Sequence, residues 1–344
     1  MIQVYKYNLL DCTLRDGSYI TEGKFSDDSI RDIINTLIES NLDFIEVGYL
    51  NNTKEYSGNS THWDSIERIE NYLPADRKKS IILAMVDVDQ FGIEDFTPCT
   101  SKSIDGIRIV FYKHQIGMAL KYAEKINSLG YKLFMQPMVT IDYSMHEYSE
   151  LCEKLLKLSP MGISIVDSFG YMTPKDFRRY FKILDNIFPH DTMIGIHSHQ
   201  NMELALPVAI DVFNYQTERR LIVDSSLLGM GRGAGNLQTE LIANYYNNNF
   251  CLKYNIDELM RLVNDHIISI REQRRWGYSP YYFLTAYMRC HPNYAGYLLE
   301  SHQISITEFK KYLEIVPVEK KTKCRRPYVE ELYNKFIAEK EWNK

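Results

Sequence analysis

The sequence lacks the marks of membrane, disulfide-bonded and nucleic-acid-binding proteins. Its six cysteines are scattered without a Cys-x-x-Cys pair, which argues against a disulfide framework or a zinc knuckle and favours reduced thiols in the cytoplasm. Forty basic and 45 acidic side chains give a net charge of −5, so we expect no surface for nucleic acid. Apolar runs such as 81–86 are far shorter than the roughly 20 residues of a membrane-spanning helix. The start of the chain has no basic stretch followed by an apolar run, so we expect no signal peptide.

Short apolar segments recur instead, and they alternate with stretches of helical spacing. Their near-continuous apolar character is typical of parallel strands that are buried on both faces. Eight such units predict a (β/α)8 TIM barrel, and a doubly wound sheet is the structural alternative. The expected strands are Tyr7–Leu14, Phe44–Tyr49, Ile81–Val86, Gly106–Phe111, Leu133–Val139, Gly162–Asp167, Met193–His197 and Leu221–Ser226.

The expected helices divide the chain into two parts. Ser26 and Thr173 are suitable N-caps for two of them, and Thr173 is followed by a proline at the first helical position. After residue 250 the pattern changes to helices without strands, so we predict a catalytic barrel over 1–250 and a C-terminal helical region over 251–344. The expected helices are Asp27–Glu39, His114–Leu129, His146–Leu158, Pro174–Phe188, Glu203–Phe213, Ile256–Arg271, Pro280–Met288, Ile306–Leu313 and Val329–Glu341.

Three polar clusters follow expected strands, at the end of the barrel where active sites of this fold are built. The first holds Arg15 next to Asp16. A carboxylate suits a divalent ion and a guanidinium can hold substrate oxygens, although a buried ion pair would explain the two residues equally well.

The second cluster is His197-x-His199, after the seventh strand. Two imidazoles at strand spacing lie on the same side of the backbone, which favours metal ligation over packing. With one carboxylate the set offers two nitrogens and an oxygen, for which manganese, magnesium, iron or zinc can each be argued.

The third cluster is a loop with four alternating glycines that ends at Asn236. Its spacing is wrong for a dinucleotide fingerprint. Gly233 and Gly235 allow a tight turn whose N–H groups can approach an anion, although many such loops are only turns. Asn236 could offer an oxygen to a metal.

Together these motifs resemble the DRE-TIM metallolyase superfamily (HMGL-like), within which 4-hydroxy-2-oxovalerate aldolases are the nearest match. The resemblance rests on the first cluster, the His-x-His pair and the Gly-Met-Gly-x-Gly-Ala-Gly-Asn loop. It extends into the segment Trp276–Tyr282, which is similar to the start of the aldolases' C-terminal helical part. Hydroxymethylglutaryl-CoA lyase and isopropylmalate synthase belong to the same superfamily.

The resemblance implies a divalent metal held by Asp16, His197 and His199, with Asn236 as a further ligand or beside it. Mn²⁺ is the expected metal, and Mg²⁺, Co²⁺ or Zn²⁺ are alternatives.

It also implies roles for four other side chains. Arg15 would hold a 2-oxo acid, Glu46 matches an acidic residue on the second strand, and Tyr278 matches a tyrosine that lines the pocket. The sequence departs from the aldolases at Tyr19, where they carry a histidine as catalytic base. An ordinary tyrosine is a poor base at neutral pH, so the base and the exact substrate stay open.

The expected function is a metal-dependent aldolase, a carbon–carbon lyase that cleaves or forms 4-hydroxy-2-oxo acids through a pyruvate-type enolate. Its partners would be a 2-oxo acid and an aldehyde, an aldehyde-processing enzyme and further copies of the chain, without nucleic acid or membrane. One alternative is a Claisen-type acyltransferase that uses acyl-CoA and a 2-oxo acid. Another is a non-catalytic barrel subunit.

Overall fold

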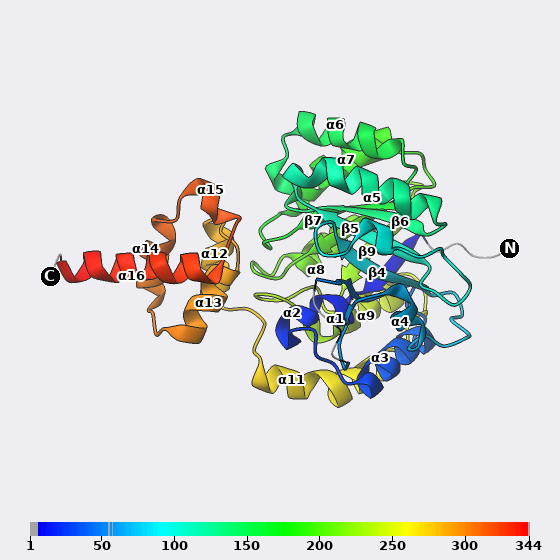
Figure 1. Ribbon diagram of the computed structural model, residues 1–344, viewed down its shortest axis with the longest axis horizontal. Helices are drawn as coiled ribbons and strands as arrows, with labels where there is room; N and C mark the ends of the chain where they lie inside the picture. The colour runs from blue at the N-terminus through cyan, green and yellow to red at the C-terminus, as the bar shows by residue number, and fades with distance from the viewer. Residues whose placement is uncertain (1–5, 54–55, 57, 343–344) are drawn as a thin grey trace.

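The protein folds as a closed parallel barrel with helices between its strands, which confirms the (β/α)8 prediction. The computed structural model describes residues 6–53, 56 and 58–342 (Figure 1). The sheet has the order β1-β9-β8-β7-β6-β5-β4-β2, and a β1–β2 pairing closes it. Its strands are β1 Tyr7–Asp11, β2 Phe44–Leu50, β4 Ile81–Asp87, β5 Gly106–Phe111, β6 Lys132–Pro137, β7 Gly162–Asp167, β8 Met193–Ser198 and β9 Leu221–Ser225.

A ninth, two-residue strand, β3 (His62–Trp63), was not predicted. It pairs with Tyr49 and Leu50 of β2, whereas β1 pairs with Phe44 and Ile45 at the other end of β2. β1 ends earlier than the predicted Tyr7–Leu14, because the chain turns at Cys12 into the short helix α1 (Thr13–Asp16). This early turn brings Arg15 and Asp16 into the barrel mouth.

The helices confirm most of the predicted ranges, including the caps at Ser26 and Thr173. A single π turn, Val263–Ile267, divides the predicted helix Ile256–Arg271 into two. The helices are α2 Ser18–Thr21, α3 Asp27–Glu39, α4 Ile66–Glu70, α5 Ile116–Ser128, α6 Met145–Leu156, α7 Pro174–Ile187, α8 Ala205–Phe213, α9 Thr239–Asn249, α10 Ile256–Leu262, α11 Ile268–Gln273, α12 Pro280–Tyr287, α13 Asn293–Ser301, α14 Ile306–Glu314, α15 Val318–Lys321 and α16 Arg326–Trp342.

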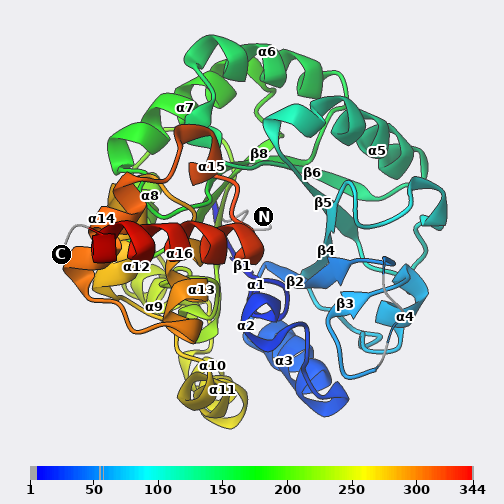
Figure 2. The same ribbon diagram turned by 60° about the vertical axis from the view of Figure 1, so that its left-hand side comes forward.

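The C-terminal helices have a hydrophobic core of their own. The core of the barrel extends as far along the chain as Trp276, whereas a second core begins at Leu284 and includes Phe309 and Val329. Helices α12–α16 form a separate group beside the barrel in Figure 1, and this group lies in front of the barrel in Figure 2. By their cores, α10 and α11 belong with the barrel, while the boundary at residue 250 stays a prediction. None of the helices in the described ranges combines the length and the apolar character that a membrane crossing needs.

Candidate metal centre and active-site cavity

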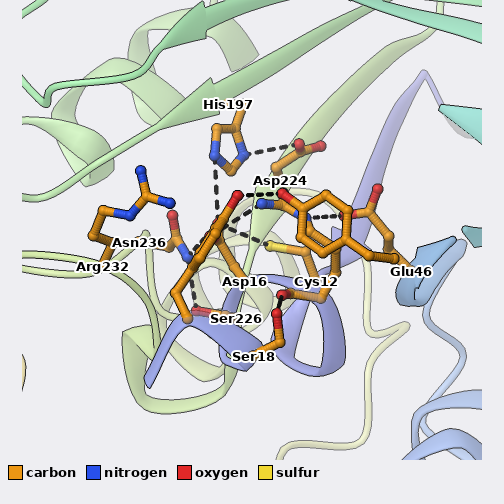
Figure 3. A network of polar contacts seen from close by, with 12 residues as sticks. Cys12, Asp16, Ser18, Glu46, His197, Asp224, Ser226, Arg232 and Asn236 are labelled. Carbon is orange, nitrogen blue, oxygen red and sulfur yellow. Dashed lines mark hydrogen bonds and ion pairs between the residues drawn. The ribbon is translucent and has the colours of Figure 1, made fainter. Parts of the chain in front are cut away.

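The barrel mouth brings three potential metal donors together. Cys12 and Asp16 come from the turn after β1, and His197 comes from the end of β8. Their ligand atoms lie within 4.8 Å of one another, and all three side chains are buried. Figure 3 shows the imidazole of His197 between the carboxylates of Asp224 and Asp16. Cys12 was not predicted as part of this cluster.

Hydrogen bonding fixes which nitrogen of His197 faces Asp16. Burial opposes ionisation of Asp224, but Arg108 and His197 hold the pKa of this carboxyl below its ordinary value. The ionised Asp224 accepts a hydrogen bond from Nδ1 of His197 at 3.0 Å. In the neutral ring, Nε2 therefore keeps its lone pair, and it lies 3.5 Å from Oδ2 of Asp16.

Asp16 is also ionised, so Nε2 of His197 faces a second carboxylate. Burial alone would raise the pKa of Asp16, but Arg15, His197 and His199 lower it to about 2. Nδ2 of Asn236 donates to the same carboxylate at 2.8 Å, while its own Oδ1 is buried and has no partner among the described residues. An imidazole lone pair, a carboxylate and an unpaired amide oxygen form a donor set that fits a divalent cation.

His199 lies next to this set. Its ring meets that of His197 edge to face, with centroids 5.0 Å apart, and it lines the same cavity. Burial lowers the pKa of His199 to about 3, so its imidazole is neutral and can bind a metal. None of the described residues forms a hydrogen bond with that imidazole. Of the four predicted ligands, Asp16 lies close to His197 and Asn236, whereas His199 lines the same cavity outside the group of donor atoms that lie within 4.8 Å of one another. The role of all four as ligands stays a prediction.

A buried ion-pair network lies beneath the donors. Glu46 accepts from Nε of Arg15 at 2.6 Å and from Arg108 at 3.1 Å. Arg108 reaches Asp224 at 2.5 Å, and Arg15 contacts Asp16 at 3.0 Å. Each of these five side chains is almost fully buried. The network therefore ties the metal donors to three strands and keeps their charges compensated.

A second group of polar side chains forms one wall of the cavity. The hydroxyl groups of Tyr19 and Tyr49 are hydrogen-bonded to each other. The guanidinium of Arg232 lies 3.8 Å from the centre of the Tyr19 ring, and its Nη1 is 3.2 Å from Nε2 of His291. Since His291 comes from the C-terminal region, the helical extension contributes directly to this cavity.

The metal donors open onto one cavity at the barrel mouth. Arg15, Asp16, His197 and His199 line it together with Arg232 and His291. Its other side is mostly apolar, with Met85, Val110, Met138, Val166 and Phe169.

Two predicted residues outside this lining, Glu46 and Asn236, contact Arg15 and Asp16 within it. Three others, Tyr278, Gly233 and Gly235, also lie outside it. Tyr278 is 56% exposed, and the structure does not bring it to the cavity. Gly233 and Gly235 adopt positive φ angles of 68° and 84°. A Cβ on Gly235 would lie 2.0 Å from the carbonyl oxygen of Gly229, so this glycine allows the loop to close on itself and to hold Asn236. The proposed roles of these three residues in catalysis and substrate binding stay predictions.

Sequence reasoning missed several residues of the site. Arg108 is a charge within the otherwise apolar strand β5, a signal that the sequence contains. Arg232 and Asp224 lie in or beside the glycine loop, for which the sequence pattern predicted roles only for the backbone and Asn236. His291 carries no local signal, because it reaches the cavity only through the packing of the C-terminal helices.

Comparison with known proteins agrees with this geometry. The HMGL-like family matches residues 6–265. Oxaloacetate decarboxylase from Mycobacterium tuberculosis is 25% identical over 281 residues, which cover 79% of this chain and 80% of that protein. The 4-hydroxy-2-oxovalerate aldolase 6 of Rhodococcus jostii is 27% identical over 247 residues, which cover 68% of this chain and 66% of that protein.

Among solved structures, hydroxymethylglutaryl-CoA lyase from Bacillus subtilis shares the fold, with a TM-score of 0.63 and 17% identity. The match covers 79% of this chain and 95% of that one. At 17% identity, this match shows the fold alone. With three quarters of its length matched by the family, the chain belongs to the HMGL-like family and is a carbon–carbon lyase.

Proposed function

We propose that this protein is a divalent-metal-dependent aldolase that cleaves or forms 4-hydroxy-2-oxo acids, with pyruvate or a homologue as one product. The observation that carries the proposal is the close approach of two potential metal donors at the cavity, Nε2 of His197 and Oδ2 of Asp16, which lie 3.5 Å apart. Asp16, His197, His199 and Asn236 would hold the divalent cation.

A divalent ion in this position would act as a Lewis acid on the keto and carboxylate oxygens of a 2-oxo acid. Arg15 binds the same end of the substrate. Its Nε is held by Glu46 and its Nη1 by Asp16, whereas its Nη2 has no hydrogen bond to any described residue. As the C3–C4 bond breaks, its electron pair moves toward the keto oxygen, and a guanidinium that is already in place stabilises the charge that develops.

Tyr19 is the group that we propose to exchange a proton with the 4-hydroxyl. Burial raises the pKa of Tyr49 well above its usual value, so Tyr49 keeps its proton and donates it in the hydrogen bond to Tyr19. That hydrogen bond and the adjacent guanidinium of Arg232 hold Tyr19 at the cavity. In cleavage the Tyr19 oxygen takes the hydroxyl proton as the aldehyde leaves. The same proton is then delivered to C3 of the enolate, which gives pyruvate, and synthesis is the reverse.

We also propose Mn²⁺ as the metal, further copies of the chain and an aldehyde-processing enzyme as partners, and a cytoplasmic location. Elemental analysis of the purified protein and light scattering test the metal and the oligomer.

The test of the function is an assay of Mn²⁺-loaded protein with 4-hydroxy-2-oxo acids of several chain lengths. We expect pyruvate and aldehyde in equal amounts, and no product from the metal-free protein or from His197→Gln. Absence of turnover at every chain length, with metal bound as tightly by His197→Gln as by the wild type, would contradict the proposal.

Two further arms separate the alternatives. Carbon dioxide from oxaloacetate, without aldehyde from any hydroxy acid, would identify a decarboxylase like the mycobacterial relative. Release of free thiol from acetyl-CoA in the presence of a 2-oxo acid would identify the acyltransferase.

A further inference from the structure

The wall formed by Arg232 and His291 differs from the rest of the cavity in its charge. Arg15 and Arg108 each contact two carboxylates. Arg232 has no carboxylate partner among the described residues, although it lines the cavity beside the metal donors. Its guanidinium instead lies against the ring of Tyr19, 3.8 Å from the centroid. A cation in a largely enclosed site without a counterion favours the binding of an anion.

The hydrogen bonds of His291 show that an acceptor is missing here. Its Nδ1 accepts from the backbone N–H of Asn293 at 3.0 Å, and its Nε2 lies 3.2 Å from Nη1 of Arg232. Burial, with Arg232 and His199 nearby, lowers the pKa of His291 well below its usual value, so the ring is neutral. A neutral imidazole has one lone pair, and two N–H donors cannot both use it.

One of the two contacts therefore lacks an acceptor. With the proton on Nε2, His291 and Arg232 present two N–H donors to a shared acceptor. Packing holds the ring of His291 in place, because its centroid is 5.3 Å from that of Phe169 and its backbone N–H donates to Lys321 at 2.7 Å.

We propose that Arg232 and His291 form a subsite for a second anionic group of the substrate, a carboxylate or a phosphate on the carbon chain beyond the 2-keto group. This inference rests on the proposed function, because the metal end of the cavity must hold the 2-oxo acid. The C-terminal helices then determine which substrates fit, because they supply His291.

The test compares pairs of ligands that differ only in the second charge. Calorimetry on the Mn²⁺-loaded protein measures the affinities of 2-oxoglutarate against 2-oxopentanoate, and of phosphonopyruvate against 2-oxobutyrate. We expect the wild type to prefer the charged member of at least one pair by roughly tenfold or more, and the pair with the larger ratio distinguishes carboxylate from phosphate.

Three variants assign this preference. In Arg232→Gln the ratio falls to about one, and in Arg232→Lys it is intermediate, since lysine keeps the charge but loses the planar fork. The matched control is Arg275→Gln, at an exposed arginine outside the cavity lining, which keeps the wild-type ratio. A wild-type ratio near one for both pairs, or a ratio that both Arg232 variants retain, would overturn the subsite.

The outcomes also separate the subsite from the proposed function. If pyruvate does not bind but the preference exists and depends on Arg232, the aldolase proposal fails and the subsite stands. If pyruvate binds and no preference exists, only the subsite fails.

Discussion

Two parts of the cavity use the same side-chain types in opposite ways. The floor is the buried ion-pair network of Arg15, Asp16, Glu46, Arg108 and Asp224, and the wall is formed by Tyr19, Tyr49, Arg232 and His291. On the floor, Arg15 and Arg108 alternate with Glu46 and Asp224, and every guanidinium has carboxylate partners. On the wall, Arg232 has an aromatic ring and another donor as neighbours. Charges that are paired before any ligand binds position the donors, whereas donors without acceptors are available to the ligand. The barrel thus supplies the proposed chemistry, and the C-terminal helices help to supply the specificity.

The largest expected effect comes from removing His197, the proposed metal ligand that contacts Asp224 of the floor. His197→Gln should weaken Mn²⁺ binding by more than the roughly 10- to 100-fold that is typical for loss of a residue that only supports a ligand. Activity should fall with it. Metal titration followed by electron paramagnetic resonance measures the change.

Asp224→Asn is the matched variant, because it keeps His197 and removes the negative charge that Asp224 presents to His197 Nδ1 and to Arg108. We expect it to lose metal affinity within that 10- to 100-fold range. Equal metal affinity in His197→Gln and the wild type would show that the floor does not bind the metal.

Loss of the hydroxyl group of Tyr19 on the wall should slow turnover without removing the metal. Tyr19→Phe should lower kcat by about 100-fold or more, the size of a typical general acid–base contribution. Tyr19→His should recover part of the rate, since the aldolases carry a histidine in this position. Steady-state kinetics and the Mn²⁺ content of each variant check this. If Tyr19→Phe keeps the wild-type kcat, another group is the base.

A third change, Glu46→Gln, tests the paired charges of the floor through the free energy of unfolding. Glu46→Gln leaves two buried guanidiniums with one carboxylate fewer and should cost about 3–5 kcal/mol of unfolding free energy. Chemical denaturation measures this loss. The control, Glu331→Gln, breaks an exposed pair with Lys335 and should leave the unfolding curve unchanged. A small loss of unfolding free energy in Glu46→Gln would mean that the ion-pair network does not stabilise the floor of the cavity.

The last expected effect concerns Asp167, a buried carboxyl group that forms no ion pair with any described residue. Burial raises the pKa of Asp167 to about 7, although backbone N–H groups of Met172 and Tyr171 donate to it at 3.1 Å. Between pH 4 and 7 the unfolded chain carries this group ionised and the folded chain carries it protonated. The group therefore makes stability fall as pH rises through that window, by up to about 1.4 kcal/mol per pH unit.

Asp167→Asn should remove this part of the slope. Denaturation curves of the variant and the wild type at several pH values compare the two. Parallel pH profiles from 4 to 7 would contradict the assignment.

The sequence predicted the barrel and the metal-donor set because both depend on local pattern. Apolar strands and the His197-x-His199 spacing are visible in a single segment, and Arg15–Asp16 stands where a strand ends. The early turn at Cys12 could not be read, since Thr13 and Leu14 are as suitable for a strand as for a helix. β3 has only two residues, which is too short for a pattern.

The wall could not be predicted, because it depends on packing between distant segments. Arg232 and His291 are 59 positions apart, and no periodicity connects them. Tyr278 shows the opposite case, in which a local motif suggested a pocket residue that the structure leaves exposed. Contacts between the C-terminal helices and the barrel decided both outcomes.

The most direct measurement is a crystal structure of the protein soaked with Mn²⁺ and oxalate, with anomalous data to locate the metal. We expect an anomalous peak about 2.0–2.3 Å from a carboxylate oxygen of Asp16 and from imidazole nitrogens of His197 and His199, with oxalate between this peak and Arg15. A peak elsewhere, with Asp16 and His197 still in direct contact, would contradict it.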